Sequence, residues 1–247
     1  MRASVCVLLL VLTSRVCAQT EPPPHSFVSI DPSRLPRAGD TISMRELLIP
    51  EKARKELRRS QNALQSGDAR SSAQHLERAL QIYPNYLEGH NRLGSCYIEL
   101  REYEKAAGEF QKAIDIDPRV MAPINNLSVA LFLLQRYPEA EAAARRAHNL
   151  DPRDPTARYM LGAILATENR SPEEAMEMLR QIKSEFPDAY LLLAKILVGR
   201  GNVEEGKKEL RDYLLLPDAE KRQNVERWLA RLERKPVEDP TKQPKTP

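Results

Sequence analysis

Residues 87–120, LEGHNRLGSCYIELREYEKAAGEFQKAIDIDPRV, contain the unit on which the fold of this chain depends. The phrase KAIDIDP, which ends at Pro118, has two close counterparts: RALQIYP, which ends at Pro84, and RAHNLDP, which ends at Pro152. These three prolines are spaced by 34 residues each time, and Pro187 follows after 35 residues. A fixed period of this length is typical of helical repeat arrays. The sequence therefore predicts a chain built from copies of one unit.

Small and large apolar residues are placed within this unit as two crossing helices require. Gly94 and Ala106 are small, so that the two backbones can approach closely, and Tyr97 and Phe110 can fill the space around the crossing. Pro118 cannot continue a helix and separates one unit from the next. Each unit is therefore predicted to be a pair of helices joined by a turn.

Other parts of the chain carry the same arrangement with decreasing regularity. Residues 121–154 form a regular copy, and residues 155–188 form another, with one extra residue near Asn169 in the turn between the helices. The copies over 53–86 and 188–217 are irregular, and the latter is expected to have a shortened first helix.

The spacing within residues 87–120 resembles the pattern of the tetratricopeptide repeat (TPR) family. His90 stands where the family often has Trp. The resemblance covers about residues 53–217 and implies an all-α fold, an α-solenoid of about five helix-turn-helix repeats within residues 50–217. The residues that carry it are Leu93, Gly94, Tyr97, Ala106, Phe110, Ala113 and Pro118.

A last amphipathic helix is predicted over residues 218–234. Its apolar residues follow the spacing of a one-faced helix, as expected of a cap that covers the last repeat on one side and faces water on the other. These residues are Val225, Trp228, Leu229 and Leu232.

The segments outside the repeats differ from them in composition. Residues 1–18 have the charged start, apolar run and small-residue end of a secretory signal peptide, which predicts export to the periplasm, cell envelope or extracellular space. A lipid-anchored form would use Cys17, but Arg15 interrupts the pattern expected before such a cysteine. Residues 19–49 read as a proline-rich linker whose last part can dock on the first repeat, and residues 235–247 as a disordered tail.

Charge and cysteine content exclude several classes of protein. The chain has 38 Lys and Arg against 35 Asp and Glu, and this near-balance argues against binding to nucleic acid or to a membrane surface. No stretch after the signal peptide is long and apolar enough for a transmembrane helix. Only Cys96 remains after signal removal, so no intramolecular disulfide is expected, and Cys96 is interpreted as a small buried side chain.

No catalytic, metal-binding or cofactor-binding constellation is found, and we predict that the protein is not an enzyme. The histidines His25, His75, His90 and His148 form no i, i+4 pair with another histidine or a cysteine. His90 falls at a repeat-packing place, where a buried ring is expected. The chain has no nucleophile elbow, phosphate-binding loop or dinucleotide fingerprint.

The TPR resemblance implies a concave groove lined by the first helix of each repeat. We hypothesise that this groove binds an extended peptide or a partner helix, with Asn91 and Asn125 contacting backbone groups and Phe132, Leu133 and Tyr159 giving apolar contact. In the alternative, Phe132 and Leu133 only pack between repeats or under the N-terminal segment. The residues expected to contact a partner are Glu88, Asn91, Ser95, Asn125, Val129, Phe132, Leu133, Thr156 and Tyr159.

These patterns together predict an exported, monomeric scaffold or adaptor that binds a protein or peptide partner. A narrower alternative resembles the TPR pilotins that assist pilus assembly in the cell envelope. An alternative from another class is an accessory subunit of an enzyme. The sequence does not identify the partner.

Overall fold

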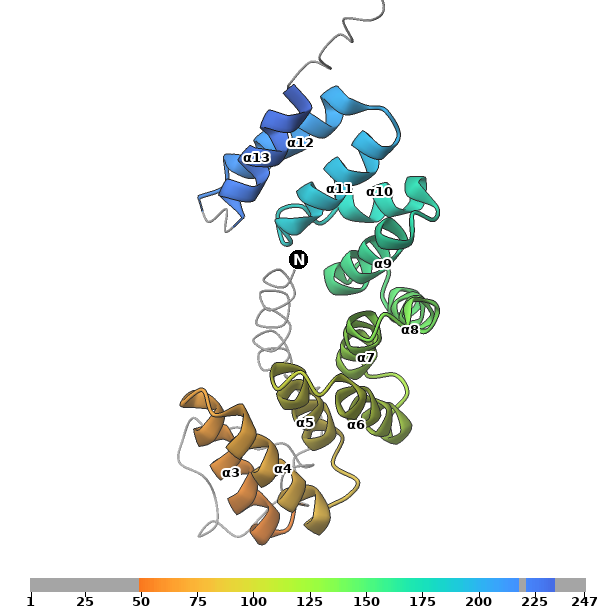
Figure 1. Cartoon of the computed structure of the whole chain (residues 1–247). Coiled ribbons are helices and arrows are strands. Elements are labelled where there is room, and N and C mark those ends of the chain that lie inside the picture. The colour runs from red at the N-terminus through yellow and green to blue at the C-terminus, as the bar shows by residue number, and fades with distance from the viewer. Residues whose placement is uncertain (1–48, 218–220, 234–247) are drawn as a thin grey trace, which may run out of the picture. The chain divides into compact units, whose positions relative to one another are not determined.

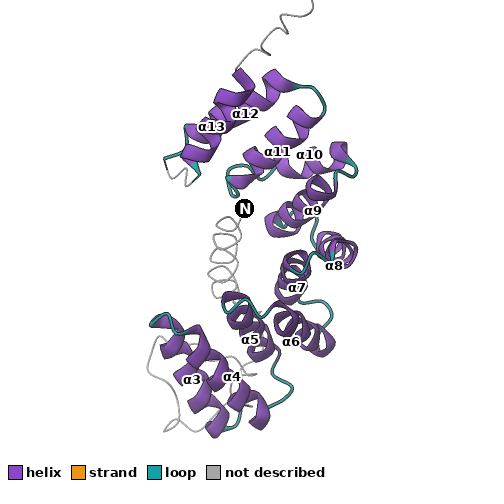
Figure 2. Cartoon of the chain, viewed as in Figure 1, coloured by secondary structure: helices purple, strands orange, loops and turns teal. Residues whose placement is uncertain are grey.

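The computed structural model of the protein describes residues 49–217 and 221–233, which form eleven helices and contain no strand (Figures 1 and 2). The all-α prediction is confirmed. No helix in these two ranges is long and apolar enough to cross a membrane. The helices are α3 (Glu51–Gln65), α4 (Ala69–Ile82), α5 (Leu87–Glu99), α6 (Tyr103–Ile116), α7 (Met121–Leu133), α8 (Tyr137–Leu150), α9 (Pro155–Glu168), α10 (Pro172–Arg180), α11 (Asp188–Gly199), α12 (Val203–Leu214) and α13 (Arg222–Glu233).

Several predicted segments lie outside the described residues. These are the signal peptide over residues 1–18, the linker up to residue 48, residues 218–220 and 234 of the capping segment, and the tail over 235–247.

The chain forms two compact units, Met1–Met160 and Leu161–Pro247. In the first unit, the pairs α3/α4, α5/α6 and α7/α8 pack as the 34-residue period predicts, and each pair contacts the next through α4 and α5 or α6 and α7. Helices α5 and α7, the first helices of neighbouring repeats, also contact each other and lie side by side. Their paired helices, α6 and α8, lie together along one flank of them (Figure 1).

The crossing of α5 and α6 depends on a glycine. A Cβ atom added at Gly94 would lie 2.5 Å from Cε1 of Phe110, so a larger residue would collide with that ring. In the second unit Gly162 has the same role, because its Cβ would lie 2.7 Å from Cγ of Leu179. The expected pairing of a small residue with a large one is therefore confirmed at two repeats.

The first repeat is built differently at this crossing. The hydroxyl oxygens of Ser60 and Ser72 lie 2.9 Å apart, and the Cys96 thiol donates to the Ser72 oxygen at 3.4 Å. All three side chains are buried, so these contacts satisfy hydroxyl groups that water cannot reach. The interpretation of Cys96 as a buried small side chain is confirmed.

Four of the turns between paired helices have a left-handed residue at the same repeat place. Gly67, Arg101, Gln135 and Asn169 have φ values of 78°, 61°, 61° and 53°, and they follow one another at 34-residue intervals. Of these four, only Gly67 avoids the steric cost that this conformation imposes on a residue with a Cβ atom.

The second unit ends in the expected cap. Val225 of α13 is buried, and its cluster includes Ala194 of α11 together with Leu210 and Tyr213 of α12. Trp228, Leu229 and Leu232 pack partly buried against the same cluster. The first helix of the last repeat, α11, has 12 residues and is shorter than the first helices of the other repeats, which have 13 to 15. The shortest helix of the described residues is α10, with 9 residues, and the sequence did not predict this.

Candidate partner-binding face

Three helices carry the nine residues expected to contact a partner, all within the first unit. Glu88, Asn91 and Ser95 lie on α5, and Asn125, Val129, Phe132 and Leu133 lie on α7, which contacts α5. Thr156 and Tyr159 lie in the first half of α9. We call this set of nine residues the candidate face.

Burial divides the candidate face into two groups. Glu88, Ser95, Phe132 and Leu133 are partly exposed. The other five side chains are buried: Asn91, Asn125, Val129, Thr156 and Tyr159.

The two buried asparagines have the same place in successive repeats and each makes one side-chain hydrogen bond. Asn126 donates from Nδ2 to Oδ1 of Asn91 at 3.0 Å. Asn125 donates from Nδ2 to Oδ1 of Asp154 at 3.0 Å, and the same Asp154 oxygen accepts the backbone N–H of Ala157 at the start of α9. Each amide is thereby held in one orientation.

This arrangement leaves a buried donor and a buried acceptor unpaired. Nδ2 of Asn91 and Oδ1 of Asn125 have no hydrogen-bond partner, although each side chain is at least nine-tenths buried. Each such group costs roughly 1–3 kcal/mol and calls for an explanation. The other unpaired atoms among the described residues, Nε of Arg54 and Nδ1 of His148, do not form such a pair on adjacent helices.

The apolar part of the candidate face is partly used for packing. The ring centroid of Phe132 lies 5.5 Å from that of Tyr137 on α8, and Leu133 packs against a core cluster with residues from α4, α5, α6 and α7. Because both side chains remain partly exposed, their role toward a partner stays a prediction.

Two family models match the chain, and both describe the tetratricopeptide repeat. One matches residues 63–131 and the other residues 125–190, so that together they cover more than half of the 247 residues. The chain belongs to the tetratricopeptide repeat family. It therefore has the fold of a protein-interaction scaffold.

Several solved structures of TPR proteins are similar to this chain. MamA has a TM-score of 0.59 at 22% identity over 76% of this chain and 98% of its own. A thermophilic TPR protein of Thermus thermophilus, TTC0263, has a TM-score of 0.56 at 19% identity, with 73% and 98% covered. YrrB, a TPR protein with an unusual peptide-binding site, has a TM-score of 0.57 at 19% identity, with 71% and 92% covered. At these identities the likeness shows the fold alone, and no curated protein matches the sequence.

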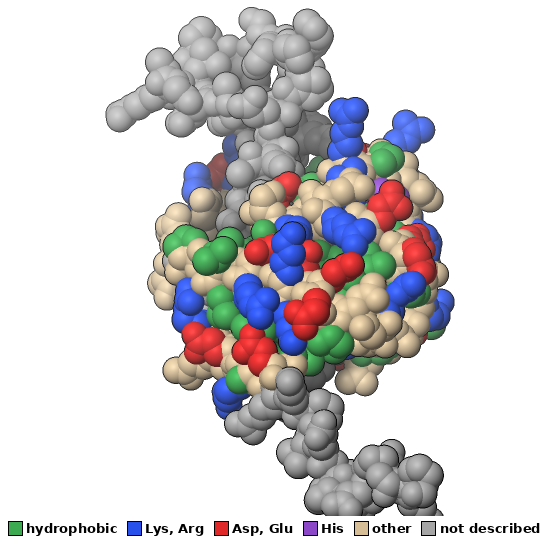
Figure 3. Space-filling view, turned by 90° about the horizontal axis from the view of Figure 1, so that it is seen from above, with side chains coloured by type: hydrophobic (Ala, Val, Ile, Leu, Met, Phe, Trp, Pro, Cys, Tyr) green, Lys and Arg blue, Asp and Glu red, His purple; other side chains and the backbone are tan. Residues whose placement is uncertain are grey.

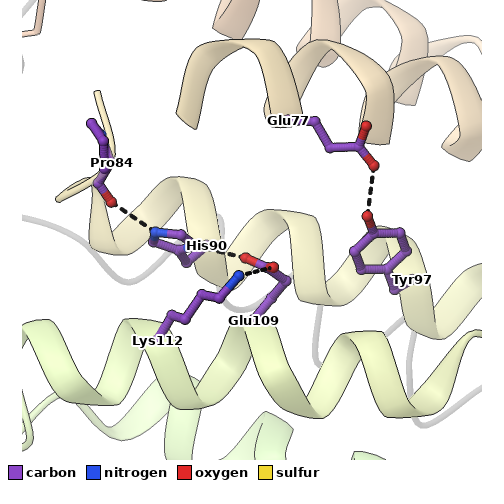
Figure 4. A network of polar contacts seen from close by, with 6 residues as sticks. All are labelled: Glu77, Pro84, His90, Tyr97, Glu109 and Lys112. Atoms are coloured by element: carbon purple, nitrogen blue, oxygen red, sulfur yellow. Dashed lines mark hydrogen bonds and ion pairs between the residues drawn. The ribbon is translucent and has the colours of Figure 1, made fainter. Parts of the chain in front are cut away.

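In the second TPR repeat, His90 is buried as predicted and joins three segments (Figure 4). Its Nε2 donates to the carbonyl oxygen of Pro84 at 2.8 Å, and its Nδ1 lies 2.6 Å from the carboxylate of Glu109 on α6. Lys112 donates to the same carboxylate at 2.7 Å. Burial raises the pKa of Glu109, but these hydrogen bonds outweigh it and lower the pKa overall.

The partner of His90 was missed by sequence reasoning although a signal was present. In the first repeat Glu56 and His75 are also 19 residues apart and meet at 2.7 Å. They hold the same two repeat places in reverse order, one residue on each helix of the pair. The contact fixes two helices of one TPR repeat against each other.

Charges elsewhere are spread over the surface. On the face shown in Figure 3, acidic and basic side chains alternate and form no patch of one sign. Within the described part of the chain, no group of three His, Cys, Asp or Glu residues is placed to hold a metal ion.

Proposed function

We propose that this TPR protein is an exported scaffold that binds an extended segment of a protein partner on the candidate face. The observation that carries the proposal is that Asn91 and Asn125, at the same repeat place on the contacting helices α5 and α7, leave one amide donor and one amide acceptor unpaired. YrrB, whose fold is similar, is a TPR protein with a peptide-binding site.

The chemistry of the two free groups favours an extended segment over a helix. An extended main chain presents both carbonyl oxygens and N–H groups, whereas those in a helix interior are already bonded to each other. Both atoms are covered in the unbound protein, so a partner would reach them only after neighbouring side chains move aside. Asn91 would then donate to a carbonyl of the partner, and Asn125 would accept one of its N–H groups. The partly exposed Phe132 and Leu133 would contact its apolar side chains.

Variants of Asn91 test this proposal. Asn91→Asp keeps an oxygen for the bond from Asn126 but replaces the free donor with an acceptor, so partner affinity should fall about tenfold or more. The partner is first captured from the native cell envelope, reduced to a binding peptide, and titrated by calorimetry. Asn149→Asp, at an exposed place on α8, is the matched control. Equal affinity of both variants and the parent protein would refute the role of Asn91.

A variant of an apolar residue separates binding from folding. The substitution Phe132→Ala, at a partly exposed side chain, should weaken capture of the partner while helical circular dichroism and the melting temperature stay near those of the parent. Loss of folding instead would assign Phe132 to packing between repeats.

Export is tested independently of binding. Sequencing the N-terminus of the protein recovered from its host should give Gln19 as the first residue. Recovery in the cytoplasm with residues 1–18 still attached would contradict export and leave the binding proposal in place.

A further inference from the structure

A second surface of the first unit is a groove between α6 and α8, and it shares no residue with the candidate face. Ile124, Leu127 and Leu131 of α7 form its floor, and its volume is about 600 Å³. We call it the α6–α8 groove.

The third repeat has apolar residues at the floor of the groove where the second repeat has a hydrogen-bonded His–Glu pair. The places held by His90 and Glu109 in the second repeat are held by Ile124 and Ala143 in the third. Both of these residues line the groove, and Ala143 is much smaller than the glutamate it corresponds to. The substitution makes the floor apolar and leaves space above it.

Small residues on both walls widen the groove further. Gly108 on α6 and Ala142 on α8 have the same repeat place, which is held by Gln74 and Glu177 in the flanking repeats. Both are exposed, and a Cβ atom added at Gly108 would meet no atom within 4 Å. The hollow therefore results from the side chains present and not from a gap in the helix packing.

The two ends of the groove differ in charge. At one end lie Glu104 and the ion pair of Arg136 with Glu139, and at the other lies Arg146, which donates to the carbonyl of Pro118 at 2.7 Å. Over the described ranges, neither Glu104 nor Arg146 forms a salt bridge, although Arg136, whose pKa is raised first by its hydrogen bond to Glu139, also interacts electrostatically with Glu104. Arg146 holds the repeat place eight residues after that of Glu104, which corresponds to about 12 Å along a helix axis.

The lining favours a helix as the occupant. None of the unpaired buried polar atoms belongs to a lining residue, so an extended segment would leave its own main-chain groups unbonded against an apolar floor. A helix bonds these groups internally and can set a row of side chains between two helices.

We propose that the α6–α8 groove docks an amphipathic helix of a protein partner. Large aliphatic side chains of that helix lie over Gly108 and Ala142. A basic residue on the helix faces Glu104, and an acidic residue about two turns away faces Arg146. This surface is independent of the candidate face, which takes an extended segment.

The test uses the full chain and labelled helical peptides of about 18 residues with a leucine stripe. One peptide carries Lys and Glu eight residues apart beside the stripe, and a control peptide carries Lys at both places. Fluorescence anisotropy should show binding of the Lys/Glu peptide. A Pro in its centre should abolish that binding. No binding of the Lys/Glu peptide, or equal binding of the Pro-containing peptide, would overturn the proposal.

A groove-filling variant locates the site. Gly108→Gln gives the second repeat the residue that the first repeat has at this place, and affinity should fall about tenfold or more. The variant should melt no lower than the parent, since glutamine is a better helix former and its Cβ meets no atom. Gln74→Ala, at the same repeat place on α4, should leave affinity unchanged. Unchanged affinity of Gly108→Gln would overturn the proposal.

Reversing the charge at Arg146 tests whether this end of the groove binds an acidic residue of the helix. Arg146→Glu should weaken binding of the Lys/Glu peptide about two- to fivefold and strengthen binding of the Lys/Lys peptide to a similar degree. No difference between the two peptides would overturn the assigned charges. Sedimentation of the chain alone should show a monomer, and dimerisation that Gly108→Gln abolishes would instead assign the groove to a second copy.

Discussion

Two glycines of the second repeat lie in very different surroundings. A methyl group at Gly94 would lie 2.5 Å from the ring of Phe110, whereas one at Gly108 would meet nothing within 4 Å. Gly94→Ala is therefore expected to lower the free energy of unfolding by about 1–3 kcal/mol, because the Phe110 ring must move. Urea unfolding followed by circular dichroism measures this change.

Gly108→Ala is the matched control on the neighbouring helix. It should leave the free energy of unfolding unchanged or raise it by about 0.5–1 kcal/mol, since alanine favours the helix. A similar decrease in the free energy of unfolding of Gly94→Ala and Gly108→Ala would contradict the close approach of Phe110 to Gly94.

The ion pair of Glu109 makes stability depend on pH on the acid side. Because the pKa of Glu109 is lowered in the folded state, the unfolded chain takes up a proton first as the pH falls. The contribution is present above the unfolded pKa of about 4.3 and is lost as the pH falls through the folded pKa. Glu109→Gln should therefore destabilise the protein at neutral pH and make its stability less sensitive to pH below about 4.3.

Urea midpoints measured across the acid range check this expectation. Glu104→Gln, at an exposed place on the same helix, is the control. In Glu109→Gln, the loss of stability with falling pH should be less steep than in the parent protein. It should not disappear, because the hydrogen bond from His75 also lowers the pKa of Glu56. An identical pH dependence of Glu109→Gln and the parent protein would show that the His90 contact contributes nothing.

At the scale of the helix pair, the turns carry avoidable strain. Gln135 has a φ of 61° in the turn between α7 and α8, where the first repeat has Gly67. Gln135→Gly should raise the free energy of unfolding by about 0.5–1 kcal/mol, because glycine adopts this conformation without a steric cost. Thermal unfolding measures the effect. Gln74→Gly, in the middle of α4, is the control and should lower the free energy of unfolding by a similar amount. A decrease in Gln135→Gly as well would argue against strain at Gln135.

The helix pairs could be predicted from the sequence because their packing residues recur at a fixed distance along the chain. The repeat places of Gly94, Phe110 and Pro118 determine where helices cross and end, and the structure has helices there. The buried environment of His90 followed from its repeat place, but its bond to Glu109 depends on the relative rotation of α5 and α6. That rotation is fixed only by the packing of the whole pair.

Features between repeats were harder to predict. Asn125 finds its partner in Asp154, which lies at the start of the next repeat, and this contact leaves the Asn125 acceptor free. The α6–α8 groove arises from four small or apolar residues on three helices, none of which is unusual in a helix taken alone. Period and composition describe one repeat at a time, whereas such sites depend on how neighbouring repeats differ.

At the scale of the whole chain, the main contacts join helices that are consecutive or belong to neighbouring repeats. Stability in such an array is expected to be the sum of local terms, so a change at one end should not spread far. Val225→Asp places a charge in the buried core between α12 and α13 and should detach the cap. Amide protection measured by hydrogen exchange should then fall about tenfold or more in α11 and α12 and stay near that of the parent in α5 and α6. Gln223→Asp, at an exposed place on α13, should change neither region. An equal loss of protection in α5 and α6 would mean that the described helices unfold together, and a local account of their stability would then fail.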